Sequence, residues 1–237
     1  TKKGSKNGAY NVNLDAYYGI SSSFNLPNML NAQQYGDLLW QASKNDGKTP
    51  ESDIYGNNPN TPTIPQWLND ENTIPSGDVD WISEIMQPAS VQSYNLSISK
   101  GDEKAQHSLS LGYFNQEGII KHTGFERFSA RFNSSYKIHD LVTIGENFTA
   151  SYKERVSVGT NSALGSIVYN ALQFPSIVPV RDINGNYAGN PLNDLANPLG
   201  SLERGKDNKL KSIQALGNVF AELNISDFTA RTSLGLD

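Results

Sequence analysis

The sequence contains no cysteine, few charged residues and no long apolar run. Without cysteine the chain can form no disulfide, thiolate nucleophile or thiolate metal site. Charged residues make up 18% of the chain, below the roughly 25% of soluble domains. Mean hydropathy is nevertheless -0.50, because Asn, Ser, Thr, Gly and Gln carry the polarity. This balance suits a protein that is apolar on one side and hydrated but weakly charged on the other.

Motifs for catalysis and for nucleic-acid binding are also missing. The sequence has no GxSxG, HExxH, P-loop or GxGxxG pattern. His107, His122 and His139 show no metal-ligand spacing. We therefore predict no enzymatic activity, no metal site and no cofactor. The net charge of -5 and the absence of a Lys/Arg run argue against a nucleic-acid partner.

A membrane-spanning helix is not predicted either. The longest uncharged stretch, residues 156–180, is interrupted by Pro175 and Pro179 and contains Asn161 and Asn170. If the chain crosses a membrane, it does so as strands.

Alternation of apolar and polar residues is the dominant pattern that is present, and it is typical of strands with two unlike faces. In the first segment Tyr10, Val12, Leu14, Ala16 and Tyr18 interleave with polar residues. Six further segments follow the same pattern, at about residues 94–98, 107–113, 128–136, 142–152, 213–223 and 228–236. Most of these segments approach the 9 to 11 tilted residues that cross a bilayer.

The connections between these segments alternate in length. Residues 100–104, 137–140 and 226–227 form tight turns, whereas long or medium connections occupy about residues 20–91, 115–124 and 154–211. Short turns on one rim and long loops on the other are the outer-membrane arrangement, in which the long loops face outside the cell. Helix-like spacing within them is found at residues 32–43, 80–86 and 162–174, and residues 182–186 predict a hairpin turn.

The number of strands predicts that the chain is part of a larger assembly. About seven strands are expected, and the last is still running at Asp237. A sheet in lipid cannot leave an edge of unpaired amides and carbonyls, each of which costs several kcal/mol. The predicted fold class is therefore all-β, as part of a large antiparallel transmembrane β-barrel with long, partly helical extracellular loops.

Several stretches resemble SusC/RagA-type TonB-dependent receptors. They are TKKG at residues 1–4, DVDWISEIMQPASVQSYNLSISKGDEKAQHSLSLGYFNQEGIIKHTGFERFSARFN at residues 78–133, FPSIVPVRDINGNY at residues 174–187 and ANPLGSLE at residues 196–203. The resemblance implies an outer-membrane importer with a 22-stranded barrel around an N-terminal plug. Residues 1–8 would end the plug domain and its linker, and residues 9–237 would be the N-terminal part of the barrel.

The same resemblance implies the partners. A SusD-like surface lipoprotein would cap the barrel from outside, TonB would energise it through parts not represented in this sequence, and outer-membrane lipid would surround it. The transported substrates would be oligosaccharides or peptides.

Five aromatic residues in the first long loop are candidates for contacting a ligand or a lid protein. They are Tyr35, Trp40, Tyr55, Trp67 and Trp81. The simpler alternative, which we favour, is that they hold this long loop together.

Three charged residues on the predicted strands are also singled out. Arg127 and Arg131 fall on the lumen-facing parity of their strand, where they could line a transport path or pack against plug carboxylates. Strict alternation points Glu146 at lipid, so we expect a β-bulge at Gly145 that turns it inward.

Three functional classes remain open from the residues. The leading hypothesis is active import without covalent chemistry. The alternatives are a non-transporting outer-membrane barrel that serves as a docking component, and a soluble all-β carbohydrate-binding module in which the apolar faces pack on each other.

Overall fold

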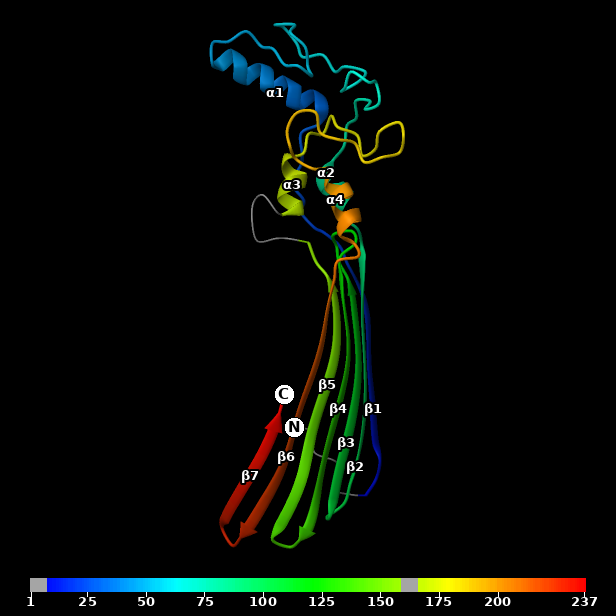
Figure 1. Cartoon of the computed structure of the whole chain (residues 1–237), viewed down its shortest axis with the longest axis vertical. Helices are drawn as coiled ribbons and strands as arrows, with labels where there is room; N and C mark the ends of the chain where they lie inside the picture. Colours follow the sequence, from blue (N-terminus) through cyan, green and yellow to red (C-terminus); the bar gives the residue numbers. More distant parts are fainter. Residues whose placement is uncertain (1–7, 159–165) are drawn as a thin grey trace.

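The chain folds as one antiparallel sheet with a layer of loops and short helices beyond one end of it (Figure 1). The computed structural model describes residues 8–158 and 166–237. The sheet has seven strands in sequence order, each hydrogen-bonded to the next. They are β1 (Asn11–Ser21), β2 (Ala89–Gly101), β3 (Ala105–Glu117), β4 (Gly124–His139), β5 (Val142–Val156), β6 (Lys209–Ile225) and β7 (Phe228–Leu236). Every predicted strand is therefore confirmed, and the antiparallel up-and-down order is that of a barrel wall.

The pairing register places most of the apolar positions on one face of the sheet. Leu14 pairs with Leu96, Leu96 with Leu111, and Leu111 with Ala130. Ala130 pairs in turn with Ala150, and Ala150 with Ala215. Cross-strand partners lie on the same face, so this row and the parallel rows beside it make one continuous apolar face. The opposite, polar face carries mainly Asn, Ser, Thr, Gln and Arg.

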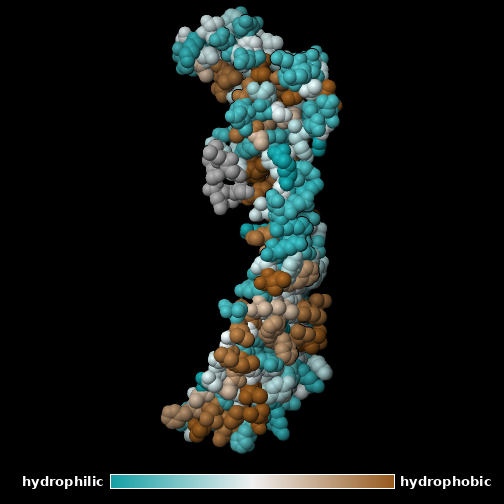
Figure 2. Space-filling model, viewed as in Figure 1, coloured by the Kyte–Doolittle hydropathy of each residue, from teal (hydrophilic) through white to brown (hydrophobic). Residues whose placement is uncertain are grey.

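The apolar face is not covered by any other part of the chain that the structure describes. Leu14 is 67% exposed and Ile213 is 81% exposed. Apolar surface gathers over the sheet half of the molecule, whereas the loop half presents mainly polar surface (Figure 2). A soluble sandwich would bury this face against a second sheet, and the described residues form a single sheet instead. None of the helices in the described ranges has the length and apolar character needed to cross a membrane.

The loop layer consists of residues 22–88, 118–123, 157–158 and 166–208. Its helices are α1 (Ala32–Asn45), α2 (Trp81–Ile85), α3 (Ile167–Gln173) and α4 (Pro198–Gly205). Asn31 caps α1 in a capping box with Gln34, and Asp80 caps α2. The helices predicted at residues 32–43 and 80–86 are thus confirmed. Of the third prediction, residues 162–165 lie outside the described residues, and α3 occupies the remainder.

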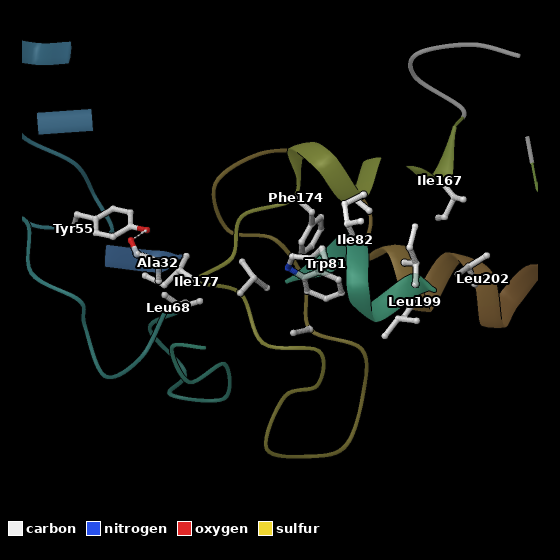
Figure 3. Packing of buried hydrophobic residues seen from close by; sticks show 14 of the residues in the cluster. Ala32, Tyr55, Leu68, Trp81, Ile82, Ile167, Phe174, Ile177, Leu199 and Leu202 are labelled. Atoms are coloured by element: carbon white, nitrogen blue, oxygen red, sulfur yellow. Dashed lines mark hydrogen bonds between the residues drawn. The ribbon is translucent and has the colours of Figure 1, made fainter. Parts of the chain in front are cut away.

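The buried core of the chain lies in this loop layer and not in the sheet (Figure 3). Fifteen buried apolar residues from both long loops form one cluster, and they include Trp81, Ile82, Phe174, Ile177 and Leu202. The Trp81 and Phe174 rings meet edge to face with centroids 4.6 Å apart. The loops therefore have a hydrophobic core of their own, as a small globular domain does.

Backbone hydrogen bonds join the connections to one another. The first long loop is bonded to the second in this way. The Gly77 amide donates to the Ile177 carbonyl at 2.7 Å, and the Val79 amide donates to the Ser176 carbonyl at 2.8 Å. The short β3–β4 connection joins the same layer, since the Lys121 amide donates to the α2 carbonyl of Ile85 at 2.9 Å. The two long connections and the β3–β4 connection thus fold as one unit.

The bulge expected at Gly145 is absent, and this prediction is wrong. β5 pairs regularly with both neighbours through Gly145 and Glu146, and the irregularity between β4 and β5 lies at Lys137 and His139 instead. Glu146 stays on the apolar face, where its carboxylate accepts a hydrogen bond of 2.9 Å from the Ser134 hydroxyl. Close packing explains why glycine occupies position 145. A Cβ there would lie 2.5 Å from the Phe220 ring, which packs over this strand.

Candidate functional site

Three of the five aromatic candidates are buried in the loop layer. Trp40, Tyr55 and Trp81 are 3%, 0% and 1% exposed. Their polar atoms are satisfied internally: the Trp40 indole donates to the Asn58 carbonyl at 2.7 Å, and the Trp81 indole donates to the Pro175 carbonyl at 3.1 Å. Rings held in this way support the loop architecture and present no free face to a ligand.

Tyr55 is the centre of the packing beneath α1. Its hydroxyl donates to the carbonyl of Ala32 at 3.0 Å, and its ring lies so close to Gly36 that a Cβ at that position would be 2.9 Å from it. Burial first, and then the nearby Tyr35 and Asp78, raise the pKa of Tyr55 to about 12. The hydroxyl therefore stays protonated and keeps its role as a donor.

The other two aromatic candidates lie at the surface of the loop layer. Tyr35 is 36% exposed on α1, one turn before the exposed Leu38. Trp67 is partly buried and pairs with Pro75 in an isolated bridge. Of the five candidates these two keep accessible ring surface, so they remain predictions as ligand or lid contacts.

Arg127 and Arg131 lie on the polar face of β4. Arg127 pairs across the strand with Lys153 of β5, and its guanidinium lies 5.7 Å from the Phe114 ring centroid. The Arg131 Nε donates to the Thr149 hydroxyl at 3.3 Å. Arg155, two residues beyond Lys153, continues the same face. Lys153 and Arg155 were not predicted as site residues. The alternation of β5 places them on the polar face, and the pairing of β5 with β4 places them beside Arg127.

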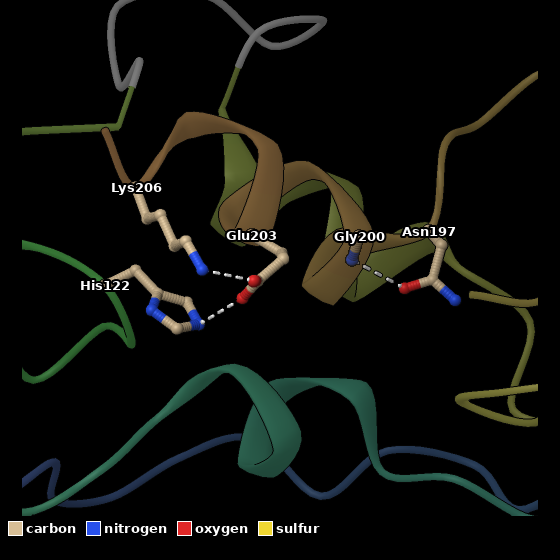
Figure 4. Close-up of polar contacts among 5 residues, drawn as sticks. All are labelled: His122, Asn197, Gly200, Glu203 and Lys206. Atoms are coloured by element: carbon tan, nitrogen blue, oxygen red, sulfur yellow. Dashed lines mark hydrogen bonds and ion pairs between the residues drawn. The ribbon is translucent and has the colours of Figure 1, made fainter. Parts of the chain in front are cut away.

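A small charged cluster joins the β3–β4 connection to α4 (Figure 4). The His122 Nε2 lies 3.3 Å from one oxygen of Glu203, and the Lys206 ammonium lies 2.5 Å from the other. The hydrogen bond from Lys206 lowers the pKa of Glu203 below its usual value, and His122 and Arg181 act in the same direction. The cluster pins two connections together at the surface.

Helix α4 itself was not predicted. Asn197 is buried, accepts from the Gly200 amide at 3.1 Å and donates to the carbonyls of Val180 and Ala188. A capping residue followed by Pro198 at the first helical position is a recognisable start signal, and it was available in the sequence.

Within the described ranges, no group of three or more His, Asp or Glu side chains is placed to hold a metal ion. The hairpin turn predicted at residues 182–186 is confirmed, with Arg181 and Tyr187 bridged and the Asp182 carboxylate accepting from the amides of Asn184 and Asn186. This geometry is that of a structural turn.

Comparison with known proteins identifies relatives among receptors. No protein-family model matches the chain. TonB-dependent receptor P26 of Formosa agariphila is 30% identical over 122 residues, which cover 51% of this chain and 11% of that protein. TonB-dependent receptor SusC of Bacteroides thetaiotaomicron is 26% identical over 192 residues, covering 68% of this chain and 18% of that protein. The chain thus spans less than a fifth of the length of either relative.

Solved structures agree in fold. A structure of the RagAB peptide transporter matches 99% of this chain and 28% of its own chain, with a TM-score of 0.71 and 23% identity. A RagAB peptide importer in its closed-closed state matches the same share with a TM-score of 0.68 and 22% identity. At this identity the likeness concerns the fold, and it includes both the sheet and the loop layer because almost the whole chain is matched. The sequence relatives are TonB-dependent receptors, and the fold is similar to that of the RagAB structures, so the chain is similar to SusC/RagA-type TonB-dependent receptors in both sequence and fold.

Proposed function

We propose that the chain forms part of the wall and outer loops of an outer-membrane importer that takes up oligosaccharides or peptides with energy from TonB. The observation that carries this proposal is the register of the sheet, which gathers most apolar positions of seven strands on one uncovered face. In this proposal residues 9–237 are the first part of a 22-stranded barrel, and residues 1–8, of which 1–7 lie outside the described residues, end the plug domain. The names of the relatives, which are TonB-dependent receptors, support the same interpretation.

Aromatic rows at two levels support a membrane position for the apolar face. Tyr94 and Tyr113 stack with centroids 6.2 Å apart, and Phe128, the cross-strand partner of Tyr113, continues this row onto β4. Near the turns, Tyr136 contacts His107 with centroids 5.0 Å apart. From Phe128 to Tyr136 the strand rises ~26 Å at ~3.3 Å per residue, or ~20 Å of height at a tilt of ~40°. That height is on the scale of the ~25 Å apolar band of outer-membrane barrels.

We propose the partners that the resemblance to SusC/RagA-type receptors implies. The loop layer would face outside the cell, where a SusD-like lipoprotein would cover it, and the accessible Tyr35 and Trp67 are candidates for that contact. The polar face would line the interior around the plug.

A pair of neighbouring substitutions in the full-length protein tests the membrane orientation. Leu96 lies on the apolar face and Ser97 on the polar face of β2. Leu96→Lys should reduce the folded, heat-modifiable form extracted from the outer membrane, because a lysine in mid-bilayer costs ~2–4 kcal/mol. Ser97→Lys is the matched control and should be tolerated. Equal tolerance of both, or a full-length protein that is soluble without detergent, contradicts the proposal.

Import itself is tested separately in the source bacterium. Uptake of the substrate should require both the full-length receptor and TonB. If the receptor is dispensable for uptake but other surface proteins are lost from the envelope without it, the barrel is a docking component instead.

A further inference from the structure

The polar face carries a group of cations near its loop end. We define the cationic stripe as Arg127 and Arg131 on β4 together with Lys153 and Arg155 on β5. Arg127 and Lys153 are direct cross-strand partners, an arrangement in which like charges destabilise a sheet. The stripe therefore has an energetic cost that the sheet alone does not offset.

The sheet separates charges between its two faces at this level. On β4, Glu126 lies on the apolar-face side, next to Arg127 in the sequence, and accepts from the Tyr113 hydroxyl at 2.9 Å. On β5, Glu154 lies on that same side between Lys153 and Arg155, and it pairs with Lys209 at 2.6 Å. The carboxylates that could neutralise the stripe thus point away from it.

The stripe has no ionic partner among the residues that the structure describes. Lys153 reaches the Gln214 carbonyl oxygen at 3.5 Å, and Arg131 bonds Thr149, but both are neutral contacts. Only two carboxylates lie on the polar face of the described strands. Asp15 is on β1, three strands from β4, which is ~14 Å at ~4.8 Å per strand. Glu222 lies toward the turns and pairs with Arg231 at 3.6 Å.

We infer that the cationic stripe binds the carboxylate groups of an acidic solute oligomer that enters from the loop side. This inference rests on the proposed function, in which the polar face lines the transport path. Arg guanidinium groups donate in a fork that matches carboxylate oxygens. A surface that carries only positive charge, on a sheet of low dielectric constant, also raises the local concentration of anionic solute. The proposal makes the substrate an acidic oligosaccharide or an acidic peptide.

Matched probes isolate charge from size. Binding to the purified full-length receptor is measured by calorimetry for tetragalacturonate and for its methyl-esterified, neutral counterpart. A second arm compares two tetrapeptides, tetraglutamate and tetraglutamine, in the same way, so that the two arms distinguish a sugar from a peptide.

The test variant removes the opposed pair, Arg127→Gln with Lys153→Gln. The affinity for the preferred anionic probe should fall about tenfold or more, while the affinity for the neutral counterpart should stay unchanged. The matched control, Lys209→Gln with Lys211→Gln, removes two charges at the same height from the opposite face and should leave both affinities unchanged.

Three outcomes overturn the inference. The first is that neither anionic probe binds more tightly than its neutral counterpart. The second is an equal loss of affinity in the control variant or for the neutral probes. The third is that the test variant lowers the thermal unfolding midpoint but leaves binding unchanged, which would mean that the cations pair with carboxylates of the receptor itself. TonB-dependent uptake and the Leu96→Lys result are independent of these outcomes, so the proposed function can survive the failure of this inference.

Discussion

Replacement of Trp81 tests whether the loop layer is held by a core of its own. The side chain is 1% exposed, packs against Phe174 and donates to the Pro175 carbonyl at 3.1 Å. Truncation of a buried tryptophan to alanine costs ~3–5 kcal/mol, because both apolar contacts and the filled volume are lost. Since the long connections share this core, Trp81→Ala should loosen all of them, while the sheet keeps its own pairing.

Amide hydrogen exchange in the full-length protein measures this effect locally. The reporters are the amides of Gly77 and Val79, which donate to carbonyls of the second long loop. Their exchange in Trp81→Ala should accelerate by ~150- to ~5,000-fold, which is the stated ~3–5 kcal/mol expressed as a local opening equilibrium. Trp81→Phe keeps a ring and removes one hydrogen bond worth ~1 kcal/mol, so it should accelerate exchange only about fivefold. Acceleration below about tenfold in the alanine variant, or an equal effect on the amides of β4 and β5, would refute an independent loop core.

Further predictions concern one glycine and two carboxylates. Gly36→Ala places a Cβ 2.9 Å from the buried Tyr55 ring and should destabilise the loop layer by ~1–3 kcal/mol, measured as a lower unfolding midpoint by near-ultraviolet circular dichroism; an unchanged midpoint contradicts the packing. The lowered pKa of Glu203 means that its ion pair with Lys206 stabilises the folded loops above the unfolded-state pKa and is lost as the pH falls through the lowered value. Protection of loop amides should therefore decline on acidification more steeply in the parent than in Glu203→Gln, and identical pH profiles would sink this assignment. Glu146→Leu removes a carboxylate from the apolar face and should raise the heat-modification midpoint, by on the order of 1 kcal/mol of stability, whereas a lower midpoint would show that the carboxylate supports the fold.

The strands were predictable because alternation persists wherever one face is apolar, but their loop-side ends were not. β2 begins at Ala89, before the predicted Tyr94, and β5 continues beyond Tyr152 to Val156. Beyond the aromatic row the otherwise apolar face becomes charged, with Glu126 on β4 opposite Glu154 on β5, so the hydropathy alternation fades while the backbone pairing continues. The loop-side ends of the strands are held by backbone hydrogen bonds, which a hydropathy pattern does not reveal.

The loop layer was less predictable for a different reason. Its decisive contacts join residues far apart in the chain, such as Trp81 and Pro175, and no local pattern specifies which partner a buried indole meets. Composition alone also cannot separate a buried aromatic residue such as Tyr55 from an accessible one such as Tyr35. Of the candidate residues, Arg127 and Arg131 were placed correctly on the polar face by strand parity, and their cationic neighbours became evident only from the pairing with β5.

The shared core of the long connections has a consequence for protein engineering and for sequence divergence. Because residues 22–88, 118–123 and 166–208 bury one another, exchanging any single connection for that of a relative would leave apolar surface without its counterpart. A functional chimaera should therefore exchange the three connections together and keep the strands of the host. The sequences of the strands and of the loop layer can then diverge at different rates, provided that the three connections change together.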